Sequence, residues 1–135
     1  MKKYAEIDQS ALPVLNVFFT GNNVNEDNFE LYLSEIKQVY DQERTIAIIF
    51  DATSATLPAT IYQKMQAKWL KDNENLIQKF CVGTAYIIPN MVIRNVLKAI
   101  FAFQKQSVPF LVCKTMNDAI LWTNQQLKTQ LNNKT

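Results

Sequence analysis

The sequence predicts an α/β fold with a mixed, mainly parallel five-stranded sheet and four helices, in the order β-β-α-β-α-β-α-β-α. Residues Thr45–Asp51 form a run that is apolar on both alternating faces, which is typical of a central strand covered on both sides. Amphipathic segments of helical period alternate with short apolar segments along the rest of the chain, and this favours parallel strands joined by right-handed crossovers. With 135 residues, 48% of them hydrophobic and 19% charged, we expect one domain over residues 1–135, with a core at about 4–128 and a frayed carboxyl-terminal tail.

The first elements are predicted to form a hairpin at the margin of the sheet. Tyr4–Asp8 alternates like an edge strand, Gln9–Pro13 is a turn, and Val14–Phe19 is a second, antiparallel strand. A helix then begins after Asn25, a good N-cap residue, and runs to about Tyr40.

After the central strand, Ala52–Leu57 is a loop rich in serine and threonine, and Pro58 lies close to the start of the next helix. That helix continues to about residue 77, with an apolar stripe formed by Ile61, Met65, Trp69 and Leu76. We expect the terminal carboxylate of the strand, Asp51, to accept hydrogen bonds from the loop that follows it.

Val82–Ile88 is predicted to be a strand whose small residues, Gly83 and Ala85, allow close approach of a helix or another backbone. A helix with a wide apolar stripe follows at Met91–Phe103. Core packing is one explanation of that stripe, and a lid over an apolar ligand is the other. The last strand is Phe110–Cys113, and Thr115 caps a final helix to about residue 127 or 131.

The composition excludes several functions. The chain has no histidine, which removes Ser-His-Asp and Cys-His catalysis and the usual zinc sites, so we expect no enzyme, no metal and no cofactor. Its two cysteines, Cys81 and Cys113, fit small buried hydrophobic positions. The amino terminus lacks an apolar run, and charged residues and a proline interrupt residues 82–103, so we expect no signal peptide, no membrane span and a cytoplasmic location.

Charge is unevenly distributed although the net value is only +2. Residues 1–60 carry nine acidic and four basic residues, whereas residues 61–135 carry three acidic and ten basic ones. This asymmetry fits a mixed solvated surface, an anionic partner or attraction between two copies. Because the basic residues are spread over three helices without a reading motif, we expect no nucleic-acid binding.

The order of elements, together with Ile48–Asp51, Gln66–Leu70, Ala85–Asn90 and Ala119–Trp122, resembles the STAS family of sulfate-transporter and anti-sigma-factor-antagonist domains. Within that family the chain resembles the bacterial SpoIIAA-like, or STAS/SEC14, proteins. The resemblance implies a β/α superhelix whose helices lie largely on one face of the sheet. We infer that the other face then needs cover from a homodimer, a partner protein or an apolar ligand.

In STAS antagonists a kinase phosphorylates a serine in an Asp-Ser-Ser-Gly turn at the start of the helix after the central strand. Thr60 lies at the corresponding position here, but Ala59 replaces the aspartate and no glycine follows. This departure favours ordinary loop and helix-cap hydroxyls over a regulated phosphosite at Thr60 or Ser54.

The leading hypothesis is therefore a non-catalytic regulatory module that binds a protein partner, a second copy, or both. Its docking loop would include Asp51, Thr53, Ser54 and Thr60. The alternative is a SEC14-like domain for a small apolar molecule or lipid, lined by Val92, Val96 and Ile100 of the predicted helix.

Overall fold

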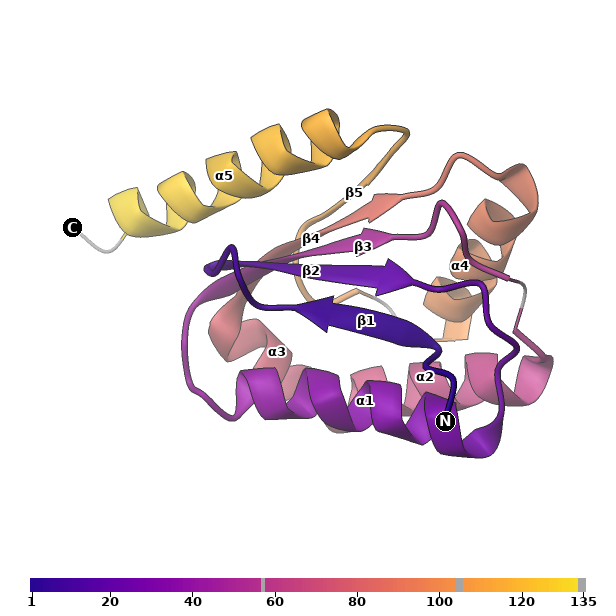
Figure 1. Cartoon of the computed structure of the whole chain (residues 1–135). Helices are drawn as coiled ribbons and strands as arrows, with labels where there is room; N and C mark the ends of the chain where they lie inside the picture. Colours follow the sequence, from indigo (N-terminus) through magenta and orange to yellow (C-terminus); the bar gives the residue numbers. More distant parts are fainter. Residues whose placement is uncertain (57, 104–105, 134–135) are drawn as a thin grey trace.

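The computed structural model describes the backbone of residues 1–56, 58–103 and 106–133, and the side chains of all of these except 93, 96, 100–103 and 132–133. Five strands form one mixed sheet in the spatial order β1-β2-β3-β4-β5, which is also their order in the chain (Figure 1). The strands are β1 (Ala5–Asp8), β2 (Val14–Phe19), β3 (Ile46–Asp51), β4 (Cys81–Ile87) and β5 (Phe110–Cys113). β1 is antiparallel to β2, and the other neighbouring strands are parallel, as predicted.

The described residues form five helices rather than the four predicted. They are α1 (Glu26–Tyr40), α2 (Thr60–Asp72), α3 (Glu74–Phe80), α4 (Met91–Phe103) and α5 (Met116–Asn133). The additional helix arises because the segment expected to form one helix is interrupted at Asn73. The backbone of this residue departs from helical geometry, with φ −109° and ψ 16°, and its side chain and its backbone N–H both donate to the carbonyl of Trp69, at 2.9 and 3.0 Å.

The helix α1 begins where the sequence predicted. The side chain of Asn25 accepts from the backbone N–H of Asn28, and the side chain of Asn28 accepts from the backbone N–H of Asn25, both at 2.8 Å. Asn28 is 1% exposed and also donates to the carbonyls of Lys2 and Asn23. This reciprocal cap therefore fixes the amino terminus of α1 to the segment before β1.

Two apolar layers cover the sheet. On one face lie α1, α2 and α3, whose core includes Leu15, Val17, Ile46 and Ile48 (Figure 1). The opposite face was expected to need cover from outside the chain, and that expectation is wrong over β3 to β5. There α5 packs on the sheet, and its Ala119 joins a buried cluster formed with Ile49, Ala85 and Ile87 (Figure 1).

The small residues of β4 permit this second layer. A Cβ placed on Gly83 would lie 2.8 Å from Cη2 of Trp122, so the indole ring of α5 rests directly on the backbone of β4. The close approach predicted at Gly83 is confirmed, and the partner is Trp122.

Candidate functional site

The carboxyl ends of β2, β3, β4 and β5 meet at one edge of the sheet because these strands are parallel. The loops that follow them therefore emerge side by side, and open α/β sheets commonly bind ligands at this edge. Asp51 ends β3, Thr53 and Ser54 lie in the loop after it, and Thr60 is the first residue of α2. We call residues 52–60 the edge loop.

Asp51 organises the edge loop. Its Oδ1 accepts hydrogen bonds from the backbone N–H and the hydroxyl of Thr53, at 3.0 and 2.6 Å. This confirms the expectation that the carboxylate accepts hydrogen bonds from the loop. The side chains of Thr53, Ser54 and Thr60 are exposed. The structure thus brings Asp51 and Thr53 together, and it leaves Thr60 on the first turn of α2, after a residue, Ala59, that has no capping side chain.

A second loop supports the edge loop from the side of β2. Gly21 has φ +84°, and a Cβ on it would lie 2.8 Å from the carbonyl oxygen of Ser54. Only glycine fits there, because both the backbone conformation and the space exclude a side chain. The sequence marked Gly21 only as a chain break, since the contact with Ser54 joins residues 33 positions apart.

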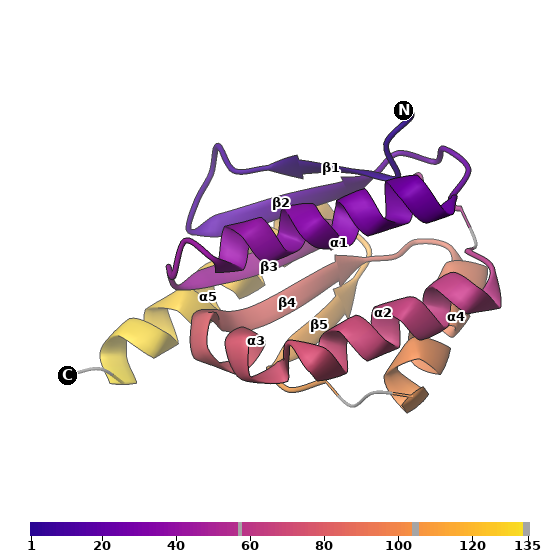
Figure 2. The same ribbon diagram turned by 90° about the horizontal axis from the view of Figure 1, so that it is seen from below.

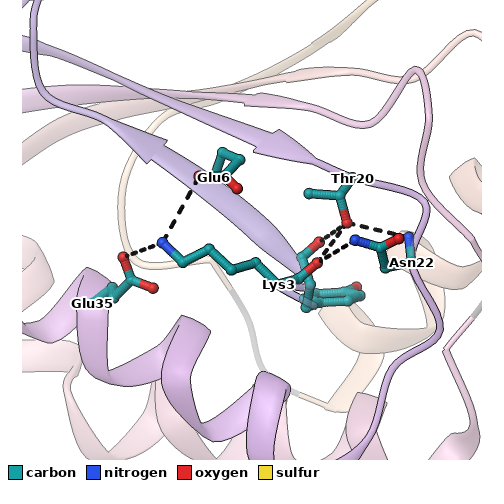
Figure 3. Close-up of polar contacts among 6 residues, drawn as sticks. Lys3, Glu6, Thr20, Asn22 and Glu35 are labelled. Carbon is teal, nitrogen blue, oxygen red and sulfur yellow. Dashed lines mark hydrogen bonds and ion pairs between the residues drawn. The ribbon is translucent and has the colours of Figure 1, made fainter. Parts of the chain in front are cut away.

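Figure 3 shows how the chain around Gly21 is held. The hydroxyl of Thr20 and the amide of Asn22 both donate to the carbonyl of Lys3, at 2.7 and 3.0 Å. The ammonium of Lys3 pairs with Glu35 of α1 at 3.1 Å and lies 3.8 Å from Glu6. The edge loop therefore rests on a segment that is tied to both β1 and α1.

Exposed apolar side chains border the edge loop. Ile61 is 63% exposed in the first turn of α2, and Met91 and Val92 are 64% and 56% exposed at the start of α4. The two helices pack side by side and begin at the same edge of the sheet (Figure 2). Three large apolar side chains thus lie next to a loop of exposed hydroxyls.

An aromatic cavity of about 130 Å³ lies between the sheet and helices α1 and α2. Nine of its described lining residues are aromatic: Tyr4, Phe19, Phe29, Tyr32, Tyr40, Phe50, Tyr62, Trp69 and Tyr86. Ala52 and Pro58 of the edge loop also line it, so the cavity reaches the edge of the sheet. α4 contributes Leu97.

From the sequence, three residues of α4 were predicted to line a site for an apolar ligand. Of these, Val92 is exposed and does not line the aromatic cavity, whereas the side chains of Val96 and Ile100 lie outside the described residues. The walls that the sheet provides were not predicted from the sequence. Phe19, Phe50 and Tyr86 come from three neighbouring strands, with ring centroids 6.3 and 5.1 Å apart and nearly parallel planes.

Burial controls the ionisation of the cavity's hydroxyl groups. It raises the pKa of Tyr4 to about 12, and it raises the pKa values of Tyr32 and Tyr40 further. Burial also raises the pKa of Tyr86, and the nearby Thr84 side chain opposes part of this rise. These phenols are therefore neutral at physiological pH and act as apolar walls with one polar tip each.

The described residues contain no group of three histidine, cysteine, aspartate or glutamate side chains arranged to hold a metal ion. Across the same residues, no helix combines the length and hydrophobicity needed to span a bilayer. What the edge of the sheet offers is binding surface: exposed hydroxyls, exposed apolar side chains and an uncharged aromatic cavity.

The strand order and the alternation of strands and helices define a mixed, mainly parallel α/β fold, as the sequence predicted, and this fold matches that of a SpoIIAA-like anti-sigma factor antagonist. Among solved structures, the chain is similar to the crystal structure of an anti-sigma factor antagonist from Mycobacterium paratuberculosis, with a TM-score of 0.57. The two chains are 14% identical, and the match covers 89% of this chain and 92% of the other. No protein-family model and no curated protein matches the sequence. At this identity the likeness concerns the fold.

Proposed function

We propose that this chain is a non-catalytic regulatory module that binds a protein partner through the edge loop and the apolar side chains beside it. The observation that carries the proposal is the position of Ile61, Met91 and Val92, which are all more than half exposed and border the loop. Exposed apolar side chains rimmed by polar groups are characteristic of protein-binding surfaces. The similarity to the fold of an anti-sigma factor antagonist supports the same conclusion.

A regulatory role by phosphorylation would act through Thr60. This residue is exposed at the amino terminus of α2, where no acidic residue occupies the first turn. A phosphate there would be favoured by the helix dipole and would place two negative charges in the docking surface. The partner is another protein or a second copy of this chain.

The test is a pulldown with the purified chain as bait. We expect Ile61→Asp and Met91→Asp to abolish retention of the partner, because each places a charge in the apolar part of the surface. Leu121→Asp is the matched control, since Leu121 is 71% exposed on α5, on the opposite face. Light scattering on the pure protein determines whether the partner is a second copy. The proposal is contradicted if Ile61→Asp, Met91→Asp and Leu121→Asp all retain the partner protein equally. It is also contradicted if neither wild type nor a Thr60→Glu variant retains any partner protein.

A second candidate, a domain that binds a small apolar molecule, is favoured by one observation, the aromatic cavity. Native mass spectrometry of freshly purified protein should then show an additional bound mass. A protein that carries no bound mass and takes up no apolar probe would contradict this candidate while leaving the docking surface unaffected.

A further inference from the structure

The volume of the aromatic cavity limits the size of an occupant. At about 130 Å³ it is close to an engineered protein cavity of ~150 Å³ that stays dry and binds benzene. It therefore fits one six-membered ring and is too small for the chains of a diacyl lipid. Of the two ligand types that the sequence left open, the volume favours the small molecule.

The lining determines the charge and shape of the occupant. No described lining residue carries a charge, so an ionised ligand would lose its hydration without gaining a partner. Aromatic pairs gain energy from offset or edge-to-face packing, and the lining supplies rings from the sheet, α1 and α2. An uncharged aromatic ring is thus the group that these walls solvate best.

One hydroxyl group in the wall makes no hydrogen bond of good geometry. Thr84 is 6% exposed and lines the cavity, and its Oγ1 meets the distance and angle limits of a hydrogen bond with no described residue, although it lies close enough to the Tyr86 side chain to lower the pKa of that phenol. Its place in the sheet accounts for this, because Thr84 pairs in register with Ile48 and shares the apolar face of that residue. A buried hydroxyl can both donate and accept, and leaving it unpaired is unfavourable.

We propose that the aromatic cavity binds an uncharged molecule with one aromatic ring and one hydrogen-bonding group, of the size of a simple phenol, and that Thr84 is its hydrogen-bond partner. The inference rests on the second candidate function and names its class of ligand. It is independent of the protein-docking surface.

The test compares three probes of similar size on the full chain: phenol, toluene and benzoate. Binding is followed by amide chemical shifts in NMR spectra and by the rise in Tm that a ligand of the folded state produces. We expect saturable shifts at lining residues such as Leu33, Ile48 and Thr84. Phenol should bind about fivefold more tightly than toluene, the ratio that corresponds to one hydrogen bond. Benzoate should not bind at the same concentrations.

Variants of the hydroxyl decide its role. Thr84→Val removes the hydroxyl and keeps the shape, so phenol should lose its fivefold advantage while toluene binds as before. Thr84→Ser keeps the hydroxyl and should keep the preference. Thr129→Val, an exposed threonine on α5, is the control and should bind both probes like wild type.

Each negative result has a distinct meaning. If neither phenol nor toluene binds wild type saturably, the second candidate function and this inference both fail. If toluene binds and phenol binds no more tightly, the proposed ligand class fails and an apolar ligand remains. If phenol keeps its advantage in Thr84→Val, the role of Thr84 fails. Should that variant not fold, Thr84→Ala, which also removes the hydroxyl, takes its place, and the ratio of the phenol and toluene affinities in it decides the point.

Discussion

Replacing Gly83 by alanine tests the packing of α5 on the sheet. The added Cβ would lie 2.8 Å from Cη2 and 3.1 Å from Cζ3 of Trp122, and 3.3 Å from Cγ of Gln126. Ordinary contact begins at 3.4 Å, so the indole must move by about 0.6 Å. The ring is rigid and packs against a buried cluster, so the displacement is passed on to its neighbours.

Overpacking of this kind costs about 1–3 kcal/mol. For a chain of 135 residues, an unfolding entropy of ~2.1 cal/mol/K per residue gives ~0.28 kcal/mol/K, so Tm should fall by about 4–11 °C. Thermal and urea denaturation followed by circular dichroism measure both quantities.

A double-mutant cycle identifies the cause. Trp122→Phe lacks the two ring atoms that the new methyl group approaches. Gly83→Ala should therefore destabilise the Trp122→Phe variant by at least ~1 kcal/mol less than it destabilises wild type, a difference within the usual range of coupling between residues in contact. The reasoning is refuted if Gly83→Ala changes stability by less than about 0.5 kcal/mol, or if the two changes are additive.

Three further predictions concern caps and ionisation. Asn28→Asp should destabilise the protein by about 2–4 kcal/mol in urea denaturation, because a buried carboxylate would face the carbonyls of Lys2 and Asn23; a loss below ~1 kcal/mol would show that these bonds matter little. Ala59→Ser should raise Tm by about 3–4 °C by supplying the N-cap hydroxyl that α2 lacks, and an unchanged Tm would mean that α2 begins elsewhere. Burial raises the pKa of the Cys81 thiol from 9.0 to about 11 and that of Tyr4 from 10.0 to about 12, so the unfolded chain loses these protons first. The free energy of unfolding should therefore fall between pH 9 and 12, by up to ~1.4 kcal/mol per pH unit for each group, and a flat profile would contradict the burial of both groups.

Local signals in the sequence predicted most of the fold. The bounds of β2, α4 and β5 agree with the predicted ranges, because each lies between residues that interrupt its pattern. The break between α2 and α3 escaped prediction because the apolar residues before and after Asn73 keep a helical spacing. The interruption lies at a single residue, Asn73, whose backbone leaves the helical region with φ −109° and ψ 16° and whose side chain bonds back to Trp69.

The contact within the edge loop was predicted from the sequence and the aromatic cavity was not, because only the first depends on residues that are close together in the chain. Asp51 and Thr53 are two residues apart, so the pattern of a strand ending on a carboxylate was enough to predict their contact. The aromatic cavity depends on strand register, which aligns Phe50 with Tyr86. It also depends on the distribution of the helices, because α5 packs on one face of the sheet and α1 and α2 lie on the other. Neither is encoded in a short segment.

The order of the strands has an electrostatic consequence. Since β1 to β5 follow one another across the sheet as they do in the chain, the separation of charge along the sequence becomes a separation in space. Among the residues that the structure describes, the part built from residues 1–60 carries nine acidic and four basic residues, and the part built from residues 61–133 carries three acidic and eight basic ones. The molecule is therefore an electric dipole directed across the strands, with a small net charge of +2. The dipole would orient a charged partner before contact, whereas the small net charge would attract it only weakly. At physiological salt this orienting effect would act only within the last ~8 Å of the approach, the distance over which charges are screened.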